Sequence, residues 1–212
     1  MEKEKYIAYV GTYTHGSSIG IHLYDVNVEE GTLSERKVVP VNNSSYVVKS
    51  KNGKYLYSIA DEGVAVFEIK PDGDLELINK VGIDGMRGCY LCVDDSGKYL
   101  FVAGYHDGKI TVLRLDPETG KVGEITEEIF HKGLGSIAER SFRPHISCVK
   151  MTRDNKYLCA ADLGIDYVNV YKLDHEKGTL KQVDIIRCDL ESAPRHLKFS
   201  DDGRYLYVVS EL

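Results

Sequence analysis

The sequence has no run that approaches the roughly 20 consecutive apolar residues needed to span a bilayer. Its first five residues, Met1-Glu2-Lys3-Glu4-Lys5, lack the apolar segment of a signal peptide. These absences predict a cytoplasmic protein without a membrane partner. Positive charge is not in excess either, since 27 Lys and Arg stand against 33 Asp and Glu, a formal net charge of −6. Nucleic-acid recognition usually needs a basic face, so we expect no nucleic-acid partner.

Cysteine is scarce and shows no metal-binding pattern. The close pair Cys89 and Cys92 lies in a short strand-like run, where residues three apart point to opposite faces. A structural zinc site needs four ligands at characteristic spacing, and the sequence has no second pair. The other cysteines are Cys148, Cys159 and Cys188, all within or beside apolar stretches. We therefore expect reduced core cysteines, no metal and no cofactor.

Helical periodicity is also missing, and an internal repeat takes its place. Four segments read alike: 52–57 (NGKYLY), 96–101 (SGKYLF), 154–159 (DNKYLC) and 202–207 (DGRYLY). Their tyrosines are 44, 58 and 48 residues apart. A second marker, Gly-x-Leu or Gly-x-Val, begins at Gly31, Gly73, Gly120 and Gly178, at intervals of 42, 47 and 58 residues. Two markers with one period predict a repeating unit of about 50 residues.

Each unit has a hydrophobic period of two and is punctuated by Gly, Asp and Asn, which predicts four short strands joined by turns. In one unit the expected strands are 46–50, 54–60, 64–70 and 75–81. The Asn-Gly or Asp-Gly turn between the first two strands is typical of a two-residue hairpin in which both central residues have positive φ. Four-stranded units of this length are typical of β-propeller blades. We therefore predict an all-β fold, with residues 1–212 forming one partial β-propeller of four-stranded antiparallel blades.

The two ends of the sequence fall within units. The chain begins at the second strand of a unit, 7–13, and ends after the second strand of the fifth unit, 205–209. Seventeen strands are expected in all. We expect the N-terminal part of a longer propeller, whose open sheet edges would let the isolated chain self-associate.

The expected topology places a candidate site. The first strand of a blade is innermost, so residues entering first strands and leaving second strands should meet at one end of the central channel. Histidine, arginine and carboxylate side chains in a concave site suit general acid–base and oxyanion chemistry. The polar residues expected there are Thr12, Tyr13, Asp61, Glu62, Tyr105, His106, Asp107, His145, Asp162, Asp166, Arg195, His196 and Glu211.

Residues 16–20 (GSSIG) match the G-x-S-x-G pattern of a serine nucleophile elbow. That elbow needs a helix after the serine, whereas residues 21–28 alternate like a strand. We therefore interpret the segment as a turn.

Several motifs together resemble one family. They are 10–14 (VGTYT) with 18–21 (SIGI), Arg140 upstream of Pro144-His145, 161–164 (ADLG) with Asp166, 194–197 (PRHL), and Glu211-Leu212. These motifs resemble those of the propeller-type 6-phosphogluconolactonases, and the resemblance extends over the whole chain. That family is similar in fold to the carboxy-muconate cyclases. The resemblance implies a seven-bladed propeller of roughly 350 residues, of which this chain would hold four to four and a half blades.

The resemblance also implies an activity and its residues. The activity is hydrolysis of 6-phosphoglucono-δ-lactone, a small phosphosugar lactone, to 6-phosphogluconate in the oxidative pentose phosphate pathway. His145, Arg195 and Glu211 match the family's catalytic positions. We expect His145 or Glu211 to act as general base, and Arg195 to stabilise the oxyanion or hold the phosphate. The candidates for substrate binding are Arg140, His196, Asp162 and Asp166, the two aspartates by orienting the catalytic side chains.

One departure from the family pattern is Ala193, where relatives commonly carry Gly before Pro-Arg-His. The sequence leaves open two alternatives to the phosphogluconolactonase activity. The propeller can be a non-catalytic scaffold for protein binding, because a fold by itself does not define a function. It can also be a lactonase or cycloisomerase acting on another sugar or carboxylate lactone. In addition, 212 residues alone can be inactive if catalytic groups lie on further blades.

Overall fold

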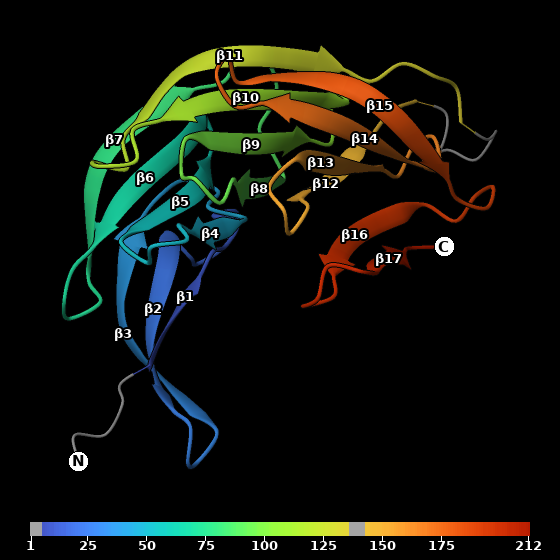
Figure 1. The fold of residues 1–212 in the computed structure, drawn as a ribbon. Helices are drawn as coiled ribbons and strands as arrows, with labels where there is room; N and C mark the ends of the chain where they lie inside the picture. Colours follow the sequence, from blue (N-terminus) through green and yellow to red (C-terminus); the bar gives the residue numbers. More distant parts are fainter. Residues whose placement is uncertain (1–5, 136–142) are drawn as a thin grey trace.

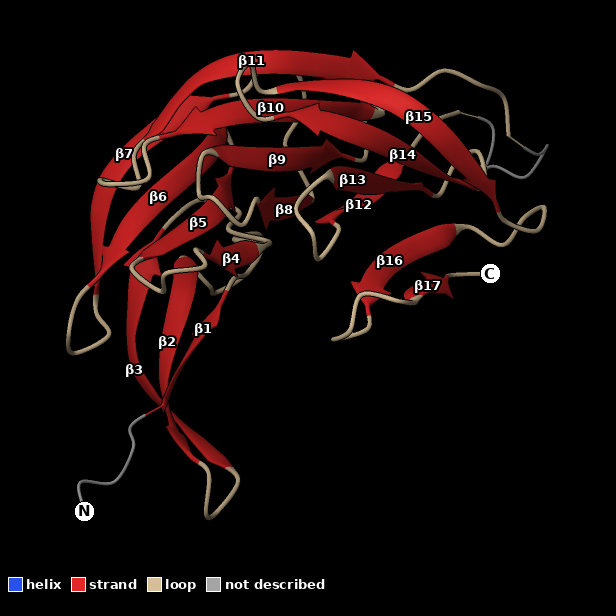
Figure 2. Ribbon diagram, in the orientation of Figure 1, coloured by secondary structure: helices blue, strands red, loops and turns tan. Residues whose placement is uncertain are grey.

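The computed structural model describes residues 6–135 and 143–212, in which every helix or strand element is a β-strand (Figures 1 and 2). Blade 1 contains β1 (Tyr6–Val10), β2 (Gly20–Asn27) and β3 (Thr32–Pro40). Blade 2 contains β4 (Val47–Lys49), β5 (Tyr55–Ala60), β6 (Gly63–Ile69) and β7 (Leu75–Gly82). Blade 3 contains β8 (Tyr90–Val93), β9 (Tyr99–Gly104), β10 (Lys109–Leu115) and β11 (Val122–Phe130). Blade 4 contains β12 (Ile146–Met151), β13 (Tyr157–Asp162), β14 (Tyr167–Asp174) and β15 (Thr179–Arg187). Blade 5 contains β16 (Pro194–Phe199) and β17 (Leu206–Ser210).

The blades fan out along an arc (Figure 1). Within each blade the strands pair antiparallel in chain order. The first strands, β4, β8, β12 and β16, lie on the inner side of the arc, and the last strands, β3, β7, β11 and β15, lie on the outer side (Figure 1). This arrangement confirms the expected partial propeller, and residues 6–135 and 143–212 form seventeen strands, the number expected.

The two repeat markers meet between neighbouring blades, which explains why they share a period. The Tyr57 hydroxyl of blade 2 donates to the Gly120 carbonyl of blade 3 at 3.2 Å, and the Tyr55 hydroxyl donates to the Glu118 carbonyl. Likewise the Tyr99 hydroxyl of blade 3 donates to the His175 carbonyl of blade 4 at 3.0 Å. A Cβ atom on Gly178 would lie 2.3 Å from the Tyr99 ring. A Cβ atom on Gly120 would likewise lie 2.4 Å from the Tyr55 ring, so Tyr55 and Tyr99 each need a glycine in the turn of the next blade.

The turn between the first two strands of a blade differs from the expected form. In 50–55 the Gly53 N–H donates to the Ser50 carbonyl at 3.0 Å, and Gly53 is the only one of the two turn residues with positive φ, 74°. The Ser50 hydroxyl accepts the Tyr55 N–H at 3.0 Å. This is the geometry of a type I turn followed by one left-handed residue, so the prediction of two central residues with positive φ was wrong. The Ser50 hydroxyl, at the first position of the turn, stabilises the turn, so a second residue with positive φ is not needed.

Candidate active site

The first strands of the blades begin on one face of the propeller, which we call the front end. They end on the opposite face, which we call the rear end. His145 directly precedes β12, Arg195 is the second residue of β16, and Glu211 follows β17 at the same end. A bulge lies at the start of both inner strands. Ser147 is skipped between the Ile146–Asp162 and Cys148–Ala161 pairs, and Arg195 is skipped between Pro194–Ser210 and His196–Val209. Bulges redirect a side chain, and here one redirects Arg195.

His145 is held in one orientation by blade 3. Its Nδ1 lies 2.7 Å from the Tyr105 carbonyl oxygen, and its ring stacks on the Tyr105 ring with centroids 4.4 Å apart. A carbonyl only accepts, so Nδ1 carries the hydrogen and the neutral ring keeps a lone pair on Nε2. The residue is 5% exposed. This tautomer is the one that a general base at Nε2 requires.

Arg195 and Glu211 form an ion pair across the front end of blade 5. The Arg195 Nη1 lies 2.6 Å from the Glu211 Oε2, and the two side chains are 49% and 26% exposed. The Arg195 carbonyl accepts the Ser147 hydroxyl at 2.8 Å, which ties β16 to the strand that follows His145. The three predicted catalytic residues therefore lie at the same end of two neighbouring inner strands.

His196 belongs to a column of equivalent residues that the sequence reasoning missed. Tyr46, Tyr90, Cys148 and His196 are 44, 58 and 48 residues apart, the same intervals as the repeat tyrosines. The Tyr46 and Tyr90 rings lie 4.2 Å apart between centroids, and the Tyr90 and His196 rings 6.0 Å. Burial lowers the pKa of His196, and the nearby Arg195 charge lowers it further. His196 is therefore neutral at pH 7 and can accept or donate a hydrogen bond beside Arg195.

Asp162 holds the backbone of the site rather than a substrate. Its Oδ1 accepts the His145 N–H at 2.8 Å and the Gly164 N–H at 3.1 Å. Its Oδ2 lies 2.6 Å from the His131 Nδ1, and the Tyr171 hydroxyl is 2.8 Å from the other ring nitrogen of His131. Asp162 is fully buried. His131 was not singled out from the sequence because its partners are 31 and 40 residues away and belong to other strands.

Asp166 has a similar role one loop further along. Its carboxylate accepts the Glu191 N–H at 2.8 Å and the Ala193 N–H at 2.9 Å, and the residue is 2% exposed. These bonds fix the segment that leads into Arg195. Both carboxylates are buried and accept main-chain N–H groups next to His145 and Arg195, which are the contacts that the expected orienting role requires. Arg140 lies outside the described residues.

Ser18 of the G-x-S-x-G match lies in a loop, and strand β2 follows it. Its hydroxyl lies 2.5 Å from the Thr12 Oγ1 and 2.7 Å from the His22 Nε2, and His22 Nδ1 lies 2.6 Å from a Glu35 oxygen. Without a helix after it, Ser18 lacks the elbow that exposes a nucleophile. These contacts tie the β1–β2 loop to β2 and β3 of blade 1, in agreement with the turn interpretation.

The cysteines are free thiols. Cys92, Cys148 and Cys159 are buried in the core, which confirms that they pack as small hydrophobic side chains. Burial raises the pKa of the Cys89 thiol to about 12, so it stays protonated at neutral pH.

In the part of the chain that the structure describes, no group of three or more His, Cys, Asp or Glu side chains is arranged to hold a metal ion. Nor does that part contain a helix long and apolar enough to cross a membrane.

Comparison with known proteins places the chain among lactonases. A family model described as "Lactonase, 7-bladed beta-propeller" matches residues 7–212. The 6-phosphogluconolactonase of Bacillus subtilis is 37% identical over 214 residues, covering 98% of this chain and 60% of the relative. The 6-phosphogluconolactonase of Formosa agariphila is 34% identical over 218 residues, covering 96% and 61%.

A solved structure agrees with this similarity. The periplasmic gluconolactonase of Pseudomonas aeruginosa superposes with a TM-score of 0.92 at 29% identity, covering 99% of this chain and 62% of that one. The chain thus spans about three fifths of the length of the relatives it matches.

Proposed function

Because the chain belongs to the family of seven-bladed β-propeller lactonases, we propose that its full-length form hydrolyses 6-phosphoglucono-δ-lactone to 6-phosphogluconate. The observation that carries the proposal is the arrangement of His145 and the Arg195–Glu211 pair at the front ends of neighbouring inner strands. The names of the Bacillus subtilis and Formosa agariphila relatives support the choice of substrate.

In the proposed reaction His145 activates a water molecule. Its Nε2 takes one proton as the water oxygen bonds to the lactone carbonyl carbon. The carbonyl oxygen becomes an oxyanion, which then re-forms the carbonyl and expels the ring oxygen. That oxygen takes the proton back from His145, so ring opening yields the free acid. The Tyr105 carbonyl stabilises the imidazolium that exists between the two steps, because it accepts the Nδ1 hydrogen throughout.

The ion pair favours His145 over Glu211 as the base. The Glu211 Oε2 already accepts from the Arg195 guanidinium at 2.6 Å, whereas the Nε2 of His145 is not used by its contact with Tyr105. We assign Glu211 the role of orienting Arg195. The half-exposed guanidinium then faces either the oxyanion or the substrate phosphate, since its planar donors suit both.

The substrate and its compartment belong to the same proposal. The product, 6-phosphogluconate, is an intermediate of the oxidative pentose phosphate pathway, and the phosphosugar would be met in the cytoplasm. A second candidate is hydrolysis of an unphosphorylated sugar lactone, favoured by the name of the Pseudomonas aeruginosa relative. The two candidate functions differ in whether a cationic side chain at the front end recognises the phosphate group of the substrate.

The test is proton release at constant pH by the full-length protein supplied with 6-phosphoglucono-δ-lactone or with glucono-δ-lactone, each corrected for spontaneous hydrolysis. We expect kcat/KM for the phosphorylated lactone to be higher by about 100-fold, since charge-assisted contacts to one phosphate are worth a few kcal/mol. Equal values would indicate the unphosphorylated substrate. No rate above the spontaneous one with either lactone would reject lactone hydrolysis.

A further inference from the structure

A cavity opens at the rear end, where the inner strands end. It has a volume of about 540 Å³ and receives residues from all four inner strands and from the turns that follow them. Its charged lining residues are Lys49, Lys51, Lys150, Arg153, Lys198, Asp95 and Asp201. Five cations thus surround the cavity against two carboxylates, in a chain whose net charge is −6.

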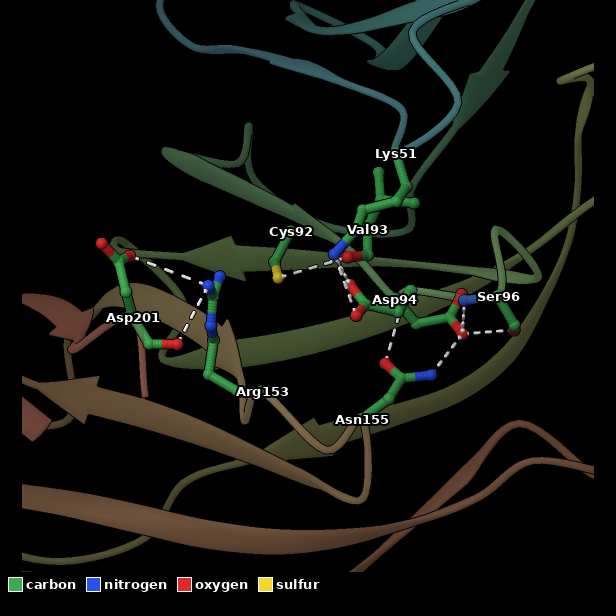
Figure 3. A network of polar contacts seen from close by, with 9 residues as sticks. Lys51, Cys92, Val93, Asp94, Ser96, Arg153, Asn155 and Asp201 are labelled. Atoms are coloured by element: carbon green, nitrogen blue, oxygen red, sulfur yellow. Dashed lines mark hydrogen bonds and ion pairs between the residues drawn. The ribbon is translucent and has the colours of Figure 1, made fainter. Parts of the chain in front are cut away.

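Each of the two carboxylates is paired with one of the five cations. Residues 51, 95, 153 and 201 occupy equivalent positions in successive blades and read Lys, Asp, Arg, Asp. The Lys51 Nζ lies 3.0 Å from both Asp95 oxygens, and the Arg153 Nη2 lies 3.7 Å from the Asp201 Oδ1 (Figure 3). Each pair bridges neighbouring blades.

Lys49, Lys150 and Lys198 are left without a carboxylate partner among the described residues. Lys150 and Lys198 are equivalent residues of β12 and β16, 48 positions apart, and Lys49 ends β4. Lys150 is only partly exposed, and its charge reaches the buried Cys92 and Cys148 thiols, whose pKa values it lowers against the larger effect of burial. Lys150 lies two residues after Cys148 in β12, so the two side chains share one face of the strand, and Lys150 lines the cavity.

Hydrogen bonds between neighbouring turns hold the frame around the cavity. The buried Asp94 carboxylate accepts the Lys98 and Tyr99 N–H groups at 2.8 Å and the Asn155 side-chain amide at 3.2 Å. The Asn155 Oδ1 in turn accepts the Asp95 N–H at 2.8 Å, which joins the turns of blades 3 and 4 (Figure 3). A pre-formed frame lowers the entropy lost when a ligand binds.

From this geometry we propose that the rear cavity binds a small metabolite carrying two or more phosphate groups, at a site separate from the front-end active site. Lys150 and Lys198 share one face of neighbouring inner strands and lack carboxylate partners among the described residues, so a polyanion between them gains favourable charge interactions. The volume lies in the range of small-molecule sites. The overall negative charge of the chain disfavours a macromolecular polyanion such as nucleic acid.

The test uses the full-length protein and inorganic tripolyphosphate, with binding followed by isothermal titration calorimetry. We expect saturable binding that is tighter than that of inorganic phosphate and weakens as salt is added. The double variant Lys150→Gln/Lys198→Gln should bind at least about tenfold more weakly, because each lysine supplies a charge-assisted hydrogen bond. A matched control, Lys121→Gln/Lys181→Gln, removes two exposed lysines outside the cavity and should keep wild-type affinity.

Three results would overturn the proposal: no binding by the wild type, equal losses in the cavity and control variants, or a loss in Arg195→Ala but not in the cavity variant. The last result would place the anion at the front end. Since neither the probe nor the measurement involves lactone hydrolysis, the outcome is independent of the proposed enzymatic function.

Discussion

The Asp162 carboxylate joins His131 to the segment that carries His145: one oxygen lies 2.6 Å from the His131 ring nitrogen and the other accepts the His145 N–H at 2.8 Å. These contacts connect β13 with the chain on both sides of the 132–144 connection. A buried carboxylate that satisfies several donors is costly to alter, since each donor left unpaired costs about 1–3 kcal/mol.

Asp162→Asn is expected to lower the free energy of unfolding by about 1–3 kcal/mol, because the new amide group opposes the His131 N–H. It should also reduce kcat of the full-length protein more than it raises KM, since His145 is displaced rather than removed. Denaturant unfolding and steady-state kinetics measure the two effects. Asp84→Asn, at an exposed aspartate, should change stability by less than about 0.5 kcal/mol. Equal effects of the two variants would refute the positioning role.

Gly178→Ala should be strongly destabilising. The added Cβ would lie 2.3 Å from the Tyr99 ring of the preceding blade, and φ is 73°. We expect a loss of about 2–4 kcal/mol, from overpacking together with a left-handed backbone. Gly53→Ala is the matched control, since its φ is 74° but nothing lies within 4 Å of the added atom. It should cost only about 1 kcal/mol in denaturant unfolding. If both cost the same, the tyrosine–glycine contact does not organise the blades.

Ala193→Gly is expected to raise stability. Ala193 has φ of 53°, in the left-handed region that favours glycine, and its N–H is held by Asp166. Relief of this strain is worth about 1 kcal/mol, less what is lost with the buried methyl group. Ala161→Gly, in the buried part of β13, should instead destabilise by about 1 kcal/mol. Changes of the same sign in the two variants would contradict the strain at 193.

The pKa of His196 should lie below 6.5, since burial and the Arg195 charge both disfavour its protonated form. The unfolded chain then binds a proton at a higher pH than the folded chain. The contribution of His196 to stability is therefore present above pH 6.5 and decreases as the pH falls toward the folded pKa. NMR titration should also show that Arg195→Gln raises this pKa, though not fully to 6.5 because burial remains. A wild-type pKa above 6.5 would contradict the assignment.

Much of the fold was predictable because each blade repeats the same local pattern. Tyr55 and Gly120 belong to the two repeated sequence markers. They contact each other between neighbouring blades, so both markers recur at the spacing of the blades. The turn type was missed because the Ser50 hydroxyl, rather than a second positive φ, satisfies the turn. His145, Arg195 and Glu211 were identified through family motifs. The buried roles of His131 and Asp162 depend on contacts between strands far apart in sequence, which no local pattern encodes.

The most direct measurement of the central claim is kcat/KM for 6-phosphoglucono-δ-lactone in full-length Arg195→Ala, compared with Arg204→Ala at an exposed position of the same blade. Losing a group that stabilises developing charge costs about 100-fold or more, so Arg195→Ala should lose at least that much while Arg204→Ala keeps the wild-type value. Equal activity of the two variants would contradict a front-end active site built around the Arg195–Glu211 pair.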